Sequence, residues 1–337
     1  KMNRILIIDP GKGWGHFVSK MYCYQKLAEY LNSKIIFLTK KSTQAKHYLE
    51  SSSFCEEVIY LEEPKKGVKN IFNNIKCLLK NIENINKFNF KSCFVFHPSV
   101  RYLMIAKFSK VKEIWGLGLK YQNFFIKKER RLYASFFSKT IKNDNESLEF
   151  VKKITHSVDI KYKPIYTANR SSKDTVGIII AASGNEKRWS IKNYLYVINF
   201  LKEKNFNKFL IISGFDQSKD ENVIKEKFKD SLKIIFTSNK KISDIIPYLK
   251  QCIFCVGNDT GFAHLSVNLD IETMIILGDC PPQSYSSLIR HVDIDSSVTR
   301  SSSSIHTIKT EKVLHELSIF LRRRGGRVVE GARLESV

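Results

Sequence analysis

The sequence has no long hydrophobic run, few acidic residues and no paired cysteine motif of the kind that binds zinc. No apolar stretch among the 337 residues reaches 18 residues, so we expect no membrane-spanning helix. The chain opens directly on a strand-like run over residues 4–8 and lacks the small-residue cleavage site of a signal peptide. These absences predict a cytoplasmic protein.

The seven cysteines lie mostly inside apolar runs. An odd, scattered set is typical of buried thiols in a reducing compartment. Cys252 and Cys255 have the spacing of a metal or redox motif, but they lie in an apolar strand and no second pair accompanies them. We therefore predict neither a zinc site nor a redox site, and no cofactor.

The 33 acidic residues are outnumbered by 56 lysines and arginines, which gives a net charge of +23. Such an excess points to an anionic partner, that is, a nucleic acid, a phosphorylated lipid, a membrane surface or a nucleotide. A codon bias towards Lys, Asn and Ile would produce the same charge without a function. The sequence has no helix-turn-helix, zinc-finger or RNA-binding signature, which argues against a nucleic-acid-binding protein.

Short apolar runs alternate with amphipathic stretches along most of the chain. Apolar strands separated by helices predict an α/β protein whose parallel sheets are covered on both faces. We expect strands at residues 5–9, 34–39, 58–61, 92–97, 112–115, 175–181, 209–213, 233–236, 253–257 and 273–277. The expected helices cover residues 17–31, 68–85, 131–141, 145–154, 191–204, 220–228, 242–251, 261–268 and 311–321.

A polar, basic segment over residues 127–170 interrupts this alternation and ends in loop-forming residues at 169–174. Such a stretch marks a linker, so we predict two α/β domains, residues 1–168 and 169–321. Beyond residue 321, Gly325, Gly326 and Gly331 interrupt any helix. We expect residues 322–337 to form a disordered tail.

Three polar loops follow predicted strands. In the first, over residues 9–16, three glycines within five positions allow a ligand to approach the backbone, and the next helix offers free amides to an anion. Lys12 adds a cation and His16 a titratable base. The loop is neither a Walker motif nor a dinucleotide fingerprint. A glycine-rich turn at a sheet edge explains the same residues.

The second loop covers residues 181–189. Ser183 and the backbone at Gly184 can donate hydrogen bonds to phosphate oxygens, and Lys187 and Arg188 supply the positive charge that a departing diphosphate needs. Trp189 fits a packing anchor. A Lys-Arg pair is also common on a solvated surface, and only its place after a strand favours a site.

The third loop covers residues 256–264. Asp259 or Thr260 can cap the following helix, Gly261 permits a close approach, and His264 lies one turn into the helix. Free amides at such a helix start meet whatever binds at the carboxyl edge of the sheet. The alternative is a helix cap with a satisfied histidine.

Residues 258–264, followed by an apolar strand and residues 278–282, resemble the C-terminal signature of the heptosyltransferase family, glycosyltransferase family 9. Residues 183–189 resemble its second motif, residues 212–214 its next strand end, and the opening strand with Gly15 and His16 its N-terminal loop. The likeness covers residues 2–320 and is loose over 94–131. It implies a GT-B fold, in which two Rossmann-like domains face each other across a cleft. It also implies transfer of a heptose from ADP-heptose to the lipopolysaccharide inner core, with inversion and without a metal.

The resemblance implies a role for each loop. The second domain would hold the nucleotide sugar, with His264 ordering the third loop. The first domain would hold the acceptor. The family usually has an aspartate directly after the glycine of the first loop, proposed as the base. That place is taken here by His16, an imidazole that can accept a hydroxyl proton near pH 7, with Asp9 in reserve. The expected donor-binding residues are Ser183, Gly184, Lys187, Arg188, Asp259, Thr260, Gly261 and His264.

The basic surface suits a phosphorylated glycolipid acceptor and peripheral contact with the cytoplasmic face of the inner membrane. The expected acceptor contacts are Lys12, Lys127, Lys128, Arg130 and Arg131, although a solvated helix face explains the last four equally well. Two alternatives remain. One is a family relative that uses another nucleotide sugar and glycan acceptor, and the other is a non-catalytic protein that binds nucleic acid or another anion.

Overall fold

The computed structural model divides into two compact units, Lys1–Tyr166 and Thr167–Val337. This division falls two residues before the domain boundary expected from the sequence. The structure describes residues 3–11, 13–49, 52–64, 70–119, 121–133, 146–157, 160, 164–165, 174–229, 231–283, 285–301 and 303–334, with residues 324–334 described by their backbone alone.

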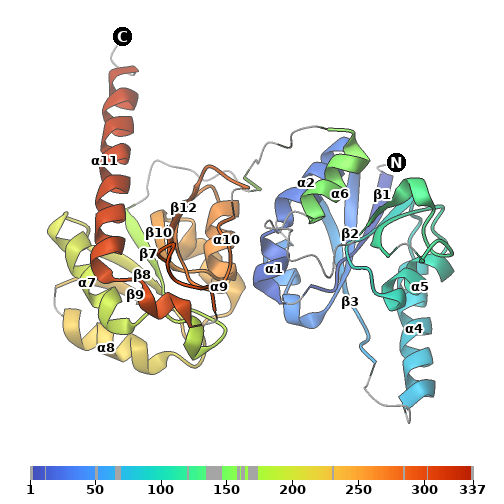
Figure 1. Cartoon of the computed structure of the whole chain (residues 1–337), viewed down its shortest axis with the longest axis horizontal. Helices are drawn as coiled ribbons and strands as arrows, with labels where there is room; N and C mark the ends of the chain where they lie inside the picture. Colours follow the sequence, from blue (N-terminus) through green and yellow to red (C-terminus); the bar gives the residue numbers. More distant parts are fainter. Residues whose placement is uncertain are drawn as a thin grey trace. The chain divides into compact units, whose positions relative to one another are not determined.

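The first unit is built on a six-stranded parallel sheet in the order β3-β2-β1-β4-β5-β6 (Figure 1). Apolar residues of β1 are almost completely buried, because β1 lies inside the sheet and its two faces are covered. The strands are β1 (Asn3–Ile8), β2 (Ser33–Thr39), β3 (Cys55–Tyr60), β4 (Ser92–Val95), β5 (Glu113–Gly118) and β6 (Arg131–Tyr133). The helices are α1 (Trp14–Val18), α2 (Met21–Tyr30), α3 (Lys46–Leu49), α4 (Ile71–Asn86), α5 (Val100–Phe108) and α6 (Glu146–Thr155).

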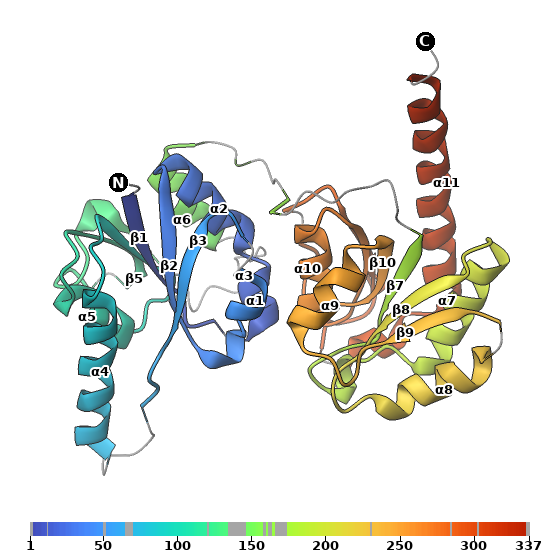
Figure 2. The same ribbon diagram turned by 180° about the vertical axis from the view of Figure 1, so that it is seen from behind.

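The second unit repeats this plan with the strand order β12-β11-β10-β7-β8-β9 (Figure 2). Its strands also run parallel, so their carboxyl ends and the loops that follow them lie at one edge. The strands are β7 (Thr175–Ile179), β8 (Lys208–Ile212), β9 (Lys233–Phe236), β10 (Cys252–Asn258), β11 (Glu272–Leu277) and β12 (Ile289–Asp293). The helices are α7 (Ile191–Glu203), α8 (Ser218–Phe228), α9 (Ile242–Leu249), α10 (Gly261–Asn268) and α11 (Thr310–Leu334).

Both units therefore have the α/β, Rossmann-like architecture that the alternation of strands and helices predicts. All ten predicted strands form, with bounds shifted by a few residues. Cys252 and Cys255 are buried in β10, as expected for thiols in an apolar strand. Among the described residues, no helix combines the length and the apolar character needed to cross a membrane.

Several elements differ from the prediction. The single helix expected at 17–31 is two helices, α1 and α2, because the Lys20 amide bonds to the Phe17 carbonyl at 3.1 Å and closes a tight turn. Strand β6 occupies the start of the helix expected at 131–141, and residues 134–141 lie outside the described residues. Helices α3 and α5 and strand β12 were not predicted.

Helix α11 also differs from the prediction. Its backbone continues to Leu334, through Gly325, Gly326 and Gly331, where we expected an interruption after residue 321. Glycine lowers helix propensity by about 1 kcal/mol per residue but does not forbid the helical backbone. The helix prediction erred in treating a weak preference as a stop signal.

Candidate functional site

The loops after β7, β10 and β11 gather at the carboxyl edge of the second sheet, because these three strands are neighbours. Asn258, buried at the end of β10, ties two of the loops together. Its Oδ1 accepts hydrogen bonds from the Trp189 amide at 3.1 Å and the Tyr194 hydroxyl at 2.8 Å, and its Nδ2 donates to the Ile180 carbonyl at 2.9 Å. The predicted second and third loops are thus fastened to each other.

Trp189 holds the second loop from its other side. The indole is buried, and its Nε1 donates to the carbonyl of Ile308 at 2.8 Å. This confirms Trp189 as a packing anchor. Ser183 is exposed and Gly184 partly exposed, so both remain accessible to a ligand at this edge.

Lys187 forms an ion pair that links the second loop to the segment after β11. Its Nζ lies 2.5 Å from Oδ2 of Asp279. The hydrogen bond with Asp279 raises the pKa of Lys187, and the nearby charge of Asp259 adds to this shift. The ammonium is therefore charged and lies close to the third loop. The sequence predicted Lys187 as a site residue, whereas Asp279, within the signature at residues 278–282, was assigned no role.

Arg188 is paired with Asp216, which follows β8. The Arg188 Nη2 lies 2.5 Å from Asp216 Oδ2, and Nη1 donates to the Asn185 side chain at 2.9 Å. The hydrogen bond from Arg188 lowers the pKa of Asp216. The Nε of Arg188 is buried without a hydrogen-bond partner among the described residues. Asp216 is 67% exposed and was not predicted as a site residue.

The third loop contains a chain of polar contacts around His264. The imidazole Nε2 lies 3.2 Å from Oδ1 of Asp259, and Nδ1 lies 2.8 Å from the hydroxyl oxygen of Tyr285. Burial alone would raise the pKa of Asp259, but the hydrogen bond from His264 and the charges of His264, His291 and Lys187 lower it overall. The Asp259 carboxylate is therefore ionised and oriented by His264. His264 is the satisfied histidine of our alternative explanation and also belongs to the polar cluster.

The start of α10 lacks the side-chain cap that we predicted. Neither Asp259 nor Thr260 makes a capping hydrogen bond, although Thr260 occupies the N-cap position with an extended backbone. The Asp259 carboxylate is turned to His264 instead. The hydroxyl of Thr260 is buried without a hydrogen-bond partner among the described residues. Such a group is costly unless a ligand or water satisfies it.

Asp259, Asp279 and Cys280 place three potential metal-ligand atoms within 4.8 Å of one another. Both carboxylates already have a cationic or hydrogen-bonding partner, in Lys187 and His264. Two carboxylates and one soft thiol also match neither the all-oxygen set of Mg²⁺ nor the thiolate and imidazole set of structural Zn²⁺. We therefore assign this cluster to the network of ion pairs and hydrogen bonds that joins these loops.

In the first unit, His16 lies in α1, just after the loop at the carboxyl end of β1, and its side chain is exposed. Gly11 makes the turn with a left-handed φ of 56°, a conformation that favours glycine. A Cβ atom there would come within 2.9 Å of the Thr43 methyl group. Lys12 lies outside the described residues.

Asp9 is buried, and three donors hydrogen-bond to its carboxylate. Its carboxylate accepts hydrogen bonds from Lys20 Nζ at 2.9 Å, the Tyr24 hydroxyl at 2.5 Å and the Gly11 amide at 2.9 Å. Burial raises its pKa, but the charge of Lys20 and these hydrogen bonds lower it overall. A buried carboxylate with three donors is a poor proton acceptor. This geometry suits a residue that shapes the first loop, and it does not support Asp9 as the reserve base.

The basic segment that we expected to contact the acceptor is divided. Lys127 and Lys128 are exposed, whereas Arg130 lies 3.4 Å from Glu113 and stacks over Trp115. Arg131 is only 3% exposed and donates to the Leu119 carbonyl at 3.1 Å. The prediction was wrong for Arg131, because this residue opens strand β6 and its side chain packs inside the unit.

Comparison with known proteins points to one family. The family model described as glycosyltransferase family 9 (heptosyltransferase) matches residues 118–315. No curated protein matches the sequence.

Solved structures provide the second comparison. A family 9 glycosyl transferase from Veillonella parvula is 14% identical, with a TM-score of 0.74, over 95% of this chain and 98% of that one. The ADP-heptose lipopolysaccharide heptosyltransferase II of E. coli is 14% identical, with a TM-score of 0.70, over 96% and 99%. The E. coli heptosyltransferase WaaC with ADP is 11% identical, with a TM-score of 0.68, over 94% and 99%. At these identities the likeness concerns the fold, and it confirms the predicted GT-B class with two Rossmann-like units.

Proposed function

Because the chain belongs to glycosyltransferase family 9, we propose that it transfers a heptose, with inversion, from ADP-heptose to a phosphorylated glycolipid of the lipopolysaccharide inner core. The observation that carries the proposal is the gathering of Lys187, Arg188, Thr260 and the start of α10 at one edge of the second sheet. Cations, a hydroxyl and helix amides are the groups that bind a diphosphate. The E. coli neighbours are described with ADP or as ADP-heptose enzymes, which supports this donor.

The diphosphate would compete with an existing ion pair for Lys187. Lys187 is held by Asp279, and a diphosphate oxygen would replace or share that carboxylate. The buried hydroxyl of Thr260 would gain its missing partner from a phosphate oxygen. The carboxylate of Asp259 repels phosphate, so we assign it to a hydroxyl of the donor sugar, with His264 fixing its orientation.

Asp216 extends the proposed donor site to the nucleoside. In Rossmann-like units, an acidic residue beyond the second strand accepts hydrogen bonds from ribose hydroxyls. Asp216 follows β8, the second strand of this unit in sequence, and is the more exposed partner of its pair with Arg188. Arg188 would then link the ribose contact to the diphosphate contact.

In the transfer step, the acceptor hydroxyl oxygen attacks the anomeric carbon from the face opposite the diphosphate. The bond from that carbon to the diphosphate oxygen breaks, ADP leaves, and the hydroxyl proton passes to the His16 imidazole. Lys187, Arg188 and the amides of α10 stabilise the departing charge, so the reaction needs no metal. We expect an unchanged rate in the presence of EDTA.

A panel of nucleotide sugars tests the donor assignment. A ligand that binds only the native state raises the free energy of unfolding, by about 2.7 kcal/mol at 100 times its Kd, and so raises the melting temperature. We expect ADP-heptose to give the largest shift, ADP a smaller one, and UDP or GDP sugars little. A larger shift with another nucleotide sugar would replace the donor and leave the family reaction in place. Salt-sensitive DNA binding without any nucleotide-sugar shift would favour the non-catalytic alternative.

A separate prediction concerns the third loop. Asp259→Ala is expected to weaken donor binding by about 10- to 150-fold, the range for loss of one hydrogen bond to a charged group. Gly261→Val is expected to impair donor use by blocking the backbone approach at the start of α10. Titration of donor binding and thermal unfolding should be measured together, with the exposed Asp295→Ala as control. If both variants lose only stability and bind the donor normally, the loop is purely structural.

A further inference from the structure

Helix α4 presents an apolar stripe to solvent. Ile71 is 54% exposed, Phe72 82%, Ile75 49% and Leu79 59%. At 100° per residue these four side chains fall within about 100° of the helix circumference. The adjoining edge of the helix is buried, since Ile85 packs in the core of the first unit with Leu78 and Ile82 against it. An exposed apolar stripe on an otherwise well-packed unit marks an interaction surface.

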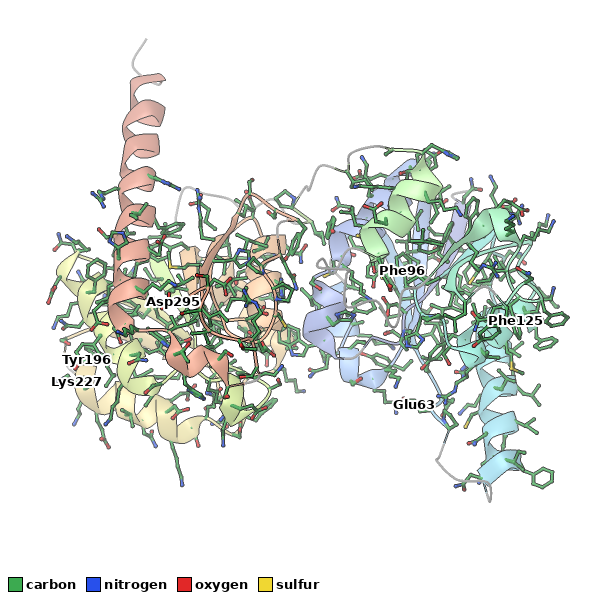
Figure 3. All side chains as sticks on the ribbon, in the orientation of Figure 1. Glu63, Phe96, Phe125, Tyr196, Lys227 and Asp295 are labelled. Atoms are coloured by element: carbon green, nitrogen blue, oxygen red, sulfur yellow. The ribbon has the colours of Figure 1, made fainter. Side chains whose placement is uncertain are left out.

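The stripe also lies where a partner can reach it. In both ribbon views the first turns of α4 extend beyond the rest of the first unit, and α5 lies beside the helix (Figures 1 and 2). The side chains drawn at this end of the helix point away from the ribbon of the first unit (Figure 3). A groove of about 290 Å³ continues from the stripe, sharing Ile71 and Ile75 with it, and is lined further by Leu78, Met104 and Arg101.

The charge around the stripe identifies the partner. Residues 62–87 contain six lysines and three acidic residues, Glu62, Glu63 and Glu83, so this stretch of the sequence has a net positive charge. On the helix itself, Lys76 and Lys80 lie beside the stripe and are exposed, with Lys80 paired to Glu62 at 2.5 Å, and Lys87 follows the last turn. A helix with an apolar face and a lysine-rich polar face lies in the interface of an anionic bilayer. A protein partner for so basic a rim would have to be acidic, and the four large apolar side chains favour lipid.

We propose that α4 docks the first unit on an anionic phospholipid surface, with Phe72, Ile75 and Leu79 inserted among the acyl chains and the lysines at the headgroups. This contact differs from the segment at Lys127 and Lys128 that the sequence suggested. It adds a binding surface to the proposed reaction and does not depend on the identity of the sugar, since the lipid recognised is the bilayer itself.

The test is co-sedimentation of the full chain with vesicles that contain neither donor nor acceptor. Vesicles of equal parts phosphatidylglycerol and phosphatidylcholine are expected to bind the protein at least tenfold more tightly than pure phosphatidylcholine, with affinity falling as salt rises. The double variant F72S/L79S is expected to bind about 10- to 100-fold more weakly. Both positions are exposed, so folding should be unaffected.

A matched control removes apolar surface elsewhere. Tyr196 is 64% and Val223 40% exposed in the second unit, and Y196S/V223S is expected to bind vesicles like the wild type. Equal vesicle binding by F72S/L79S and the wild type would overturn the proposal. So would a wild-type dimer that ignores vesicles and dissociates in F72S/L79S, because the stripe would then cover a second copy of the chain. Donor-induced thermal stabilisation, measured separately, reports on the proposed reaction alone.

Discussion

His16→Ala is expected to lower kcat by about 10²- to 10⁴-fold, the usual contribution of a general base, and to leave nucleotide-sugar affinity almost unchanged. His16 lies at the carboxyl edge of the first sheet, whereas the proposed donor contacts come from the second unit. Removing the imidazole should therefore slow the chemical step without weakening donor binding. The measurement is steady-state kinetics with a parallel titration of donor binding.

His16→Asp is the informative companion variant. It restores the carboxylate usual at this place in the family and should recover part of the lost rate. The wild-type rate should also fall in acid as the imidazole protonates, while the His16→Asp rate should persist to lower pH. A folded His16→Ala enzyme with nearly wild-type kcat would exclude His16 as the base.

Asp9→Asn separates a catalytic loss from a structural one. The pKa of Asp9 is lowered in the folded protein, so its stabilising effect is present above the ordinary carboxyl value of about 4 and disappears as pH falls through the lower folded value. Asp9→Asn should lower the melting temperature at neutral pH and differ less from the wild type in acid. A selective loss of kcat at full stability would instead return Asp9 to the role of base.

The sequence predicted the strands and the loops at their carboxyl ends because buried parallel strands are continuous apolar runs. It could not predict which side chains the residues of those loops pair with. Asp279, Asp216 and Tyr285 meet Lys187, Arg188 and His264 across distances of 21 to 92 residues, and nothing local marks such pairs.

The errors have similar physical causes. Arg131 looked like part of a solvated basic cluster, yet the strand that it opens places it inside the unit. The apolar spacing predicted helix α4 correctly but did not indicate that four of its apolar side chains face solvent. Periodicity predicts that a face is apolar and does not indicate what covers it.

Lys187→Ala is expected to weaken donor binding by about 10- to 150-fold, the range for loss of a charge-assisted hydrogen bond of 1.5–3 kcal/mol. The ammonium is already placed at the sheet edge, and its raised pKa keeps it charged. The variant loses a contact to the diphosphate, which ADP and ADP-heptose share. The affinities of both ligands, measured by calorimetric titration, should therefore fall by the same factor.

Asp279→Asn is the matched control, because it breaks the same ion pair from the other side. If Lys187 acts on the diphosphate, removing its carboxylate partner frees the ammonium and removes a negative charge near the phosphate site. Donor binding should then be equal to or tighter than in the wild type. If the pair is merely structural, Asp279→Asn and Lys187→Ala should weaken binding to the same extent, together with a fall in melting temperature. Weaker donor binding in Lys187→Ala without weaker binding in Asp279→Asn therefore distinguishes a ligand contact from a structural pair.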